Sequence, residues 1–260
     1  TTNTVVYHSK LSFDIWKNFI YNLIDGFSIR RIAEENNISI LTSFNLRHKV
    51  LKAIKKYIDN IKLSKSIQSD EKYFSINLKG TKPENMPRYS KKRTSTNSPY
   101  KGISHHKICV ITAIDEDDNI VMNIGGLGRG TIKMLDEQLG DKVEKVDLIT
   151  ADSASAYQEF CKKHNIKLVA IPSGFHNDGI NNLAEINGLH SRLEVWLTKF
   201  RGVSTRHLSD YLNWFNYIFT IKKRLDLKNI KTNSYKNIVV NENYIGVKNI
   251  CTLPMPIDLN

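Results

Sequence analysis

The stretch from residue 106 to residue 124, HKICVITAIDEDDNIVMNI, contains two runs of strand-forming residues. The first run, 106–115, is apolar enough for a buried strand, and the second, 120–124, follows an acidic turn. Upstream, the run EKYFSINL at 71–78 is rich in residues that favour strands. The sequence therefore predicts three consecutive strands.

After these strands the pattern alternates between helices and strands. It predicts a helix at 131–139, a strand at 146–150, a Ser-capped helix at 153–164, a strand at 167–171, and two long helices near 182–200 and 204–220. Three strands followed by helix, strand, helix and strand is the element order of an RNase-H-like fold. We therefore predict an α/β domain with a mixed five-stranded sheet flanked by helices.

The N-terminal part of the chain has a helical pattern throughout. Residues 11–23 carry apolar side chains at helical spacing, Ser28 is placed to cap a short helix, and Ser39 a longer one after the turn Asn36-Asn37. This is a helix-turn-helix layout. The longer helix carries a basic set that fits either a phosphate-contacting face or a solvated face: Arg47, His48, Lys49, Lys52, Lys55 and Lys56.

These patterns divide the chain into three expected parts. A small all-α helix-turn-helix domain occupies 1–66, the RNase-H-like domain 67–220, and a polar, poorly periodic tail 221–260. The segment 79–102 is long, basic and rich in Pro, Gly and Ser, and is either a DNA-contacting insertion or a surface loop.

Composition narrows the class of partner. The net charge of +12 favours a polyanion, with nucleic acid first, and no run approaches the roughly 20 apolar residues of a membrane span. Cys109, Cys161 and Cys251 form no CxxC pair, so neither a disulfide framework nor a zinc ribbon is encoded, and a reducing cytoplasm suits them. No signal segment opens the chain. Because the sequence starts with Thr1 rather than Met, we treat its N-terminus as truncated.

Two aspartates stand at strand ends. Asp70 begins the first predicted strand, and Asp152 ends the apolar run 146–152. Taken singly, Asp70 is a surface acid and Asp152 an acid at a helix N-terminus. Taken together on adjacent strands of an RNase-H-like core, they favour a site for two divalent ions, Mg²⁺ or Mn²⁺, which phosphoryl transfer needs about 3.5 to 4 Å apart.

Several short stretches form one pattern across the chain. They are SIRR (28–31), TSF (42–44) with RHK (47–49), DE (70–71) with YF (73–74), TAID (112–115), DS (152–153) with Tyr157, INGLHSR (186–192), FRGVST (200–205) and YLNWF (211–215). Their combination, spanning roughly residues 9–219, resembles the ISXO2-like, DDE-type insertion-sequence transposases.

The resemblance implies roles for four residues. Asp70 and Asp152 are the first two metal ligands, Asn187 stands at the third ligand position and His190 at the fourth catalytic position. This departs from three plain acids. Glu194 is the alternative third acid, because it lies two helical turns beyond Asn187. Family members usually carry an N-terminal zinc ribbon, and the resemblance begins just after the place where that ribbon would end.

The resemblance also implies a function. We expect a transposase that cleaves and joins DNA, binds the inverted repeats of its element and target duplex, forms a homo-oligomer in the synaptic complex, and works in the bacterial cytoplasm at the nucleoid, without a membrane. Two alternatives stay open: a decayed transposase that only binds DNA, and an RNase-H-like nuclease acting on RNA–DNA hybrids. The helix-turn-helix pattern counts against the nuclease.

Overall fold

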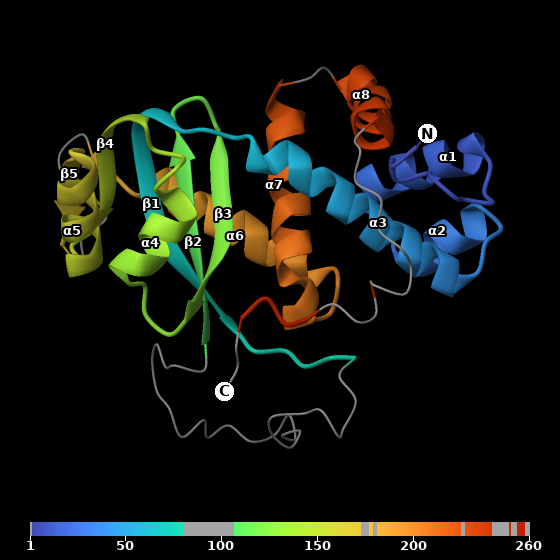
Figure 1. Ribbon diagram of the computed structural model, residues 1–260, viewed down its shortest axis with the longest axis horizontal. Helices are drawn as coiled ribbons and strands as arrows, with labels where there is room; N and C mark the ends of the chain where they lie inside the picture. The colour runs from blue at the N-terminus through green and yellow to red at the C-terminus, as the bar shows by residue number, and fades with distance from the viewer. Residues whose placement is uncertain are drawn as a thin grey trace. The chain divides into compact units, whose positions relative to one another are not determined.

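The computed structural model describes residues 2–80, 107–172, 177–178, 181–224, 227–240, 250 and 254–257. The strands of its main sheet are β1 (Ser64–Ser75), β2 (Lys107–Asp115), β3 (Ile120–Leu127), β4 (Lys145–Asp152) and β5 (Lys167–Ile171). They lie in the order β3-β2-β1-β4-β5 (Figure 1). The pairs β1–β2 and β2–β3 are antiparallel, while β1–β4 and β4–β5 are parallel. This mixed sheet confirms the predicted α/β, RNase-H-like fold.

Helices cover both faces of this sheet (Figure 1). On one face, α4 (Ile132–Leu139) packs against β2 and β3, and α5 (Ser155–His164) packs against β4 and β5. On the other face, α6 (Ala184–Thr198) lies against β1 and β2. The smaller elements of this part are β6 (Asn177–Asp178), β7 (Asn181–Asn182) and the 3-10 turn η2 (Thr205–His207).

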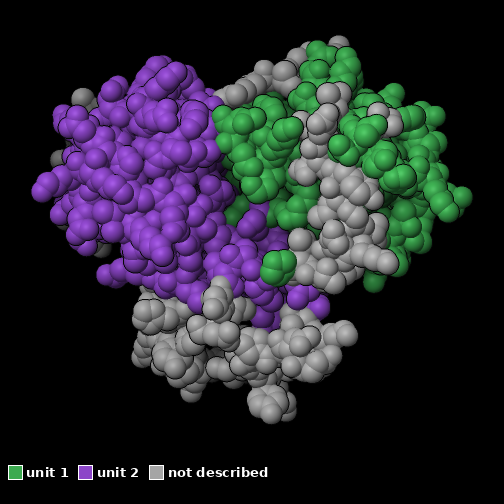
Figure 2. All heavy atoms as spheres, in the orientation of Figure 1, with its two compact units in different colours: residues 1–60, 210–254 green, residues 61–209, 255–260 purple. Residues whose placement is uncertain are grey.

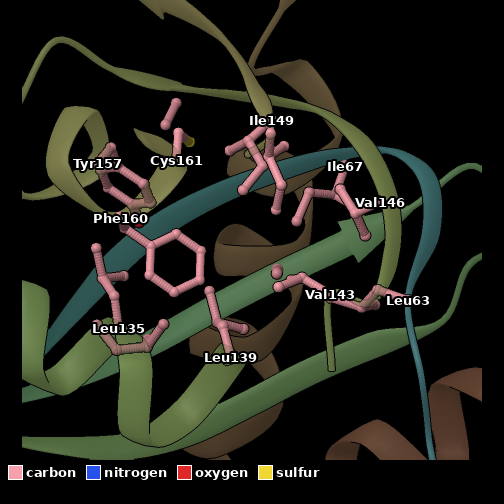
Figure 3. Close-up of a cluster of buried hydrophobic side chains, with 14 of the residues drawn as sticks. Leu63, Ile67, Leu135, Leu139, Val143, Val146, Ile149, Tyr157, Phe160 and Cys161 are labelled. Atoms are coloured by element: carbon pink, nitrogen blue, oxygen red, sulfur yellow. The ribbon is translucent and has the colours of Figure 1, made fainter. Parts of the chain in front are cut away.

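The face under α4 and α5 holds a dense apolar core. Figure 3 shows the ring of Phe160 from α5 pointing toward Leu135 and Leu139 of α4, and all three side chains are fully buried. Burying side chains of this size contributes about 1.5 to 3 kcal/mol each. The other residues labelled in the figure are Leu63, Ile67, Val143, Val146, Ile149, Tyr157 and Cys161.

Strand β1 starts earlier than the sequence analysis placed it. It begins at Ser64, seven residues before Glu71, so Asp70 lies inside the strand rather than at its start. The first half of β1 reads as a loop because Ile67 is its only apolar residue. Pairing explains the difference, since Ser64 already lies opposite Lys145 of β4, and the strand is held from both sides.

The chain forms two compact units (Figure 2). One unit contains residues 61–209 with 255–260, and the other contains residues 1–60 with 210–254. The sequence pattern predicts that the RNase-H-like domain ends at residue 220, whereas contacts group residues 210–254 with the N-terminal helices. Among the described residues, no helix has the length and apolar character needed to cross a membrane.

The unit that contains the N-terminus is helical. Its helices are α1 (Phe13–Ile24), α2 (Ile29–Glu35), α3 (Ile40–Asp59), most of α7 (Leu208–Arg224), and α8 (Leu227–Val240). The side chains of Ser12, Ser28 and Ser39 accept hydrogen bonds at the N-termini of α1, α2 and α3. The caps predicted at Ser28 and Ser39 are therefore present.

Helix α8 corrects the expectation of an aperiodic tail over 221–260. Its buried residues Ile230, Ser234 and Ile238 recur every four positions and line one face. Because Ser234 stands in the middle of that stripe, the apolar pattern in the sequence is too weak to indicate the helix.

Helix α3 turns much of its basic set inward. Arg47, His48 and Lys49 are all buried. The Arg47 guanidinium donates a 3.0 Å hydrogen bond to the Phe27 carbonyl, and Lys52 pairs with Asp210 at 2.6 Å. Three of the six basic residues are thus buried and a fourth is paired with an acid of the same unit, so neither a phosphate-contacting face nor a fully solvated face describes this helix.

Candidate functional site

Adjacent strands place Asp70 and Asp152 side by side. Gln68 of β1 pairs with Thr150 of β4, and each aspartate lies two residues further along its own strand. Side chains two residues apart on a strand share a face, and neighbouring strands lie about 4.8 Å apart. The sheet therefore presents both carboxyl groups on the face that α6 covers.

The charges around Asp70 are incompletely balanced. Burial raises the pKa of Asp70 to about 6, and the negative charge of Asp152 raises it too. The Glu71 backbone N–H, which donates a 2.8 Å hydrogen bond to Oδ1, and the Lys72 ammonium act in the opposite direction. A carboxylate in this environment would be stabilised by a bound cation.

The N-terminus of α6 is fixed to β1. The Gln68 side-chain oxygen accepts hydrogen bonds from the backbone N–H groups of Glu185 and Ile186, each 3.1 Å long. These N–H groups lie in the first turn of the helix, where no intrahelical acceptor is available. Gln68 therefore caps α6 from the sheet and sets where the helix starts along β1.

The contacts between α6 and β1 recur at matching intervals along both elements. His190 Nδ1 lies 3.6 Å from Asp70 Oδ2, and Glu194 forms an ion pair with Lys72. Four helical residues advance about 6 Å and two strand residues about 6.6 Å, so successive contacts along α6 match every second residue of β1. This match brings His190 beside the first aspartate.

His190 lies inside the fold rather than at its surface. The residue is 6% exposed, and its Nε2 lies 2.6 Å from the Thr112 hydroxyl oxygen on β2. Burial lowers the pKa of His190 to about 4, and the nearby Lys72 charge contributes. The imidazole is therefore neutral at neutral pH and can offer a lone pair to a cation.

Asn187 and Glu194 are placed differently from His190. Asn187 is exposed, and the hydrogen bonds of its backbone link it to Leu183, the N-cap residue of α6, and to Ser191 of the same helix. Glu194 has a side chain 60% exposed and faces Lys72. The structure thus brings His190 to Asp70, while the role of Asn187 as a metal ligand stays a prediction.

The donor set fits a hard divalent cation with a nitrogen ligand at one side. It combines the carboxylates of Asp70 and Asp152 with the neutral imidazole of His190. Among the described residues, the ligand atoms of these three side chains do not all lie within 4.8 Å of one another. Asp70 neighbours both Asp152 and His190, so it is the residue that two ions would share.

A second half-buried acid, Glu71, follows Asp70 directly and was not proposed as a site residue from the sequence. Burial raises its pKa to about 7, and the charges of Asp70 and Asp152 add to the effect. Its carboxyl group lies against Gly130, where a Cβ atom would collide with it. Gly130, the last residue of the run GGLGRG (125–130), therefore makes room for the Glu71 side chain.

The RNase-H-like class of the α/β domain rests on its sheet order and on the placement of the two aspartates. No protein-family model matches the chain, and no curated protein matches it.

Weak likenesses to solved structures exist. An intasome of simian T-cell lymphotropic virus in complex with PP2A regulatory subunit B56 gamma is 13% identical, with 92% of this chain and 76% of that chain covered and a TM-score of 0.33. A Mos1 strand transfer complex is 14% identical, with 92% and 82% covered and a TM-score of 0.27. At such TM-scores these likenesses carry no weight for the fold or the function.

Proposed function

We propose that this chain is a DDE-type transposase that cleaves and joins DNA with divalent metal ions. The observation that carries the proposal is the placement of Asp70 and Asp152 on adjacent strands with His190 of α6 against Asp70. The narrower assignment to the ISXO2-like group rests on the motif pattern in the sequence.

Each side chain has a proposed task. Asp70, between Asp152 and His190, would hold both ions, and Asp152 and His190 would each complete the ligands of one ion. Asn187, three residues before His190 on α6, offers a neutral carbonyl oxygen as a further ligand. When bound, Mg²⁺ or Mn²⁺ ions activate the attacking hydroxyl group and neutralise the leaving oxygen of the phosphodiester.

DNA recognition is assigned to the helical unit and to the net charge of +12. Because most basic residues of α3 are engaged internally, the first turn of that helix is the better candidate for base contacts. Ile40 and Leu41 there are 56% and 66% exposed, next to the exposed cap residue Ser39. Recognition helices read bases with their N-terminal residues, and apolar side chains contact the thymine methyl group.

The proposal includes the inverted repeats of an insertion sequence and target duplex as ligands, a homo-oligomer in the synaptic complex, and a bacterial cytoplasmic setting. Its test is incubation of the protein with the ends of its own element, a plasmid target and Mg²⁺ or Mn²⁺. We expect joined products that disappear with EDTA.

The matched controls are Asp70→Asn and Asp152→Asn, which keep side-chain size and remove charge. Both variants should still bind the element ends, with an affinity that falls steeply as salt rises, because bound phosphates release counterions. Salt-sensitive DNA binding by the wild-type protein without any cleavage would support the decayed, DNA-binding alternative. Cleavage restricted to RNA–DNA hybrids would support the nuclease.

A further inference from the structure

The Thr112 hydroxyl group lies between the first aspartate and the histidine. Thr112 pairs with Asp70 across β1 and β2, and its side chain is fully buried. Its hydroxyl oxygen lies 2.7 Å from the Asp70 backbone carbonyl oxygen and 2.6 Å from His190 Nε2. Two polar contacts of this length on one hydroxyl group restrict where its single hydrogen can be.

Counting hydrogens assigns the direction of both bonds. The Asp70 carbonyl oxygen can only accept, so the Thr112 hydroxyl hydrogen lies between these two oxygens. The same hydroxyl must then accept the second bond, which makes His190 Nε2 the donor. A neutral imidazole has one N–H group, and with that group on Nε2, the lone pair of Nδ1 is free.

The free nitrogen faces a carboxylate. His190 Nδ1 lies 3.6 Å from Asp70 Oδ2, and two acceptors at that distance share no hydrogen. A cation that binds a nitrogen and an oxygen at about 2.0 to 2.2 Å from each holds the two atoms roughly 3 to 3.5 Å apart. The observed separation is thus close to that of two ligands of one ion.

We propose that Thr112 is a positioning residue that holds His190 in its Nε2–H form, so that Nδ1 and the Asp70 carboxylate bind the same divalent cation. The inference rests on the proposed function for the presence of the cation, but the hydrogen placement does not. Hydrogen bonding of one ring nitrogen is a common means of aiming the other at a metal ion.

The first test reads the histidine directly in metal-free full-length protein. Long-range ¹H–¹⁵N correlation spectra of ¹⁵N-histidine-labelled protein near pH 7 distinguish the two neutral forms of each ring, and a His190→Asn variant assigns the His190 signals. We expect the Nε2–H form in the wild type and in Thr112→Ser, which keeps the hydroxyl group. Thr112→Val, which lacks it, should give a mixture of forms.

A wild-type His190 protonated on Nδ1, or a Thr112→Val protein with unchanged signals, would overturn the role of Thr112. The wild-type and Thr112→Ser spectra decide the direction of the bond even if Thr112→Val does not fold.

The second test measures Mn²⁺ affinity by electron paramagnetic resonance, without DNA or turnover. Loss of an outer hydrogen bond to a metal-binding histidine weakens affinity about 10- to 100-fold, so Thr112→Val should bind Mn²⁺ correspondingly less tightly and Thr112→Ser within about threefold of wild type. Equal affinities in all three proteins would overturn the shared-cation half of the proposal. Wild-type protein that shows the Nε2–H form but binds no Mn²⁺ would overturn the proposed function itself.

Discussion

The two faces of β1 have different surroundings. Odd-numbered residues such as Ile67 and Ser69 point into the core, where the Ser69 hydroxyl group lies 3.1 Å from the Tyr157 hydroxyl group. Even-numbered residues such as Gln68 and Asp70 contact α6 instead. One face packs against the apolar core. The other forms a polar contact with α6, which we call the polar seam and which contains Gln68, Asp70 and His190.

Asp70 and Glu71 make this comparison sharp, because they are adjacent acids on opposite faces. Burial raises the pKa of both carboxyl groups, to about 6 for Asp70 and to about 7 for Glu71. A raised pKa alone would indicate a functional role for both carboxyl groups. Only Asp70 shares a face with Asp152 and meets His190, so the direction of the side chain decides which acid serves the site.

The largest expected effect separates these two acids. Asp70→Asn should lower strand transfer by at least about a thousandfold, because it removes the charge that holds the ions, whereas Glu71→Gln should stay within about tenfold of wild type. Both rates are measured with the same element ends under saturating Mn²⁺. Equal loss in the two variants would show that the faces of β1 are not functionally distinct.

The next effect tests which residue of α6 completes the site. His190→Ala should reduce strand transfer about a hundredfold, and Asn187→Ala should also be strongly impaired, since both remove proposed ligands. Glu194→Ala, which only frees Lys72, should remain within about threefold. A dead Glu194→Ala together with a nearly normal His190→Ala would make Glu194 the third acid and our assignment wrong.

A third prediction concerns stability in the absence of metal. The pKa of Asp70 is about 6 in the folded chain against an ordinary 3.8, so between pH 4 and pH 6 the folded state binds more protons than the unfolded state. The free energy of unfolding therefore falls as pH rises through this range. Asp70→Asn cannot titrate, and its amide can donate to His190 Nδ1.

Above pH 6, Asp70→Asn should be more stable than wild type by about 1 to 2 kcal/mol in EDTA, as measured by urea unfolding. At pH 4 the difference should shrink. A variant that is less stable than wild type at pH 7.5 would show that the charged Asp70 carboxylate does not destabilise the metal-free folded state.

The smallest expected effect tests the polar seam at its start. Gln68→Ala removes the cap of α6 and should lower the free energy of unfolding by about 1 kcal/mol, with faster hydrogen exchange at Glu185 and Ile186. Gln68→Glu keeps an oxygen acceptor and should retain slow exchange at both amides. Unchanged exchange in Gln68→Ala would mean that the cap does not fix this end of the helix.

Strands with an apolar run could be predicted from the sequence, whereas the polar part of β1 could not. β2 and β4 could be predicted because they contain the apolar runs ICVITAI (108–114) and LITA (148–151), whereas the first half of β1 is polar and is a strand because neighbouring strands pair with it. The spacing of apolar residues likewise predicted the buried face of α3. It could not show that Arg47 donates to the Phe27 carbonyl or that Lys52 pairs with Asp210.

The site was predictable in part for the same reason. Acids at strand positions can be found from the sequence, and the resemblance supplied His190. Thr112 could not be found, because a threonine in a strand is ordinary and its contacts come from a residue far along the chain.

The step between α6 and β1 also limits how the chain can vary in length. Four residues of α6 advance roughly half an ångström less than two residues of β1, or slightly more than that. The contacting residues of the two elements therefore stay aligned over a few such intervals only. One residue inserted between Ile186 and His190 would rotate the rest of α6 by about 100° and carry the imidazole away from Asp70. We therefore expect natural length variants of this protein to place their insertions and deletions outside 184–194, however different their surface loops become.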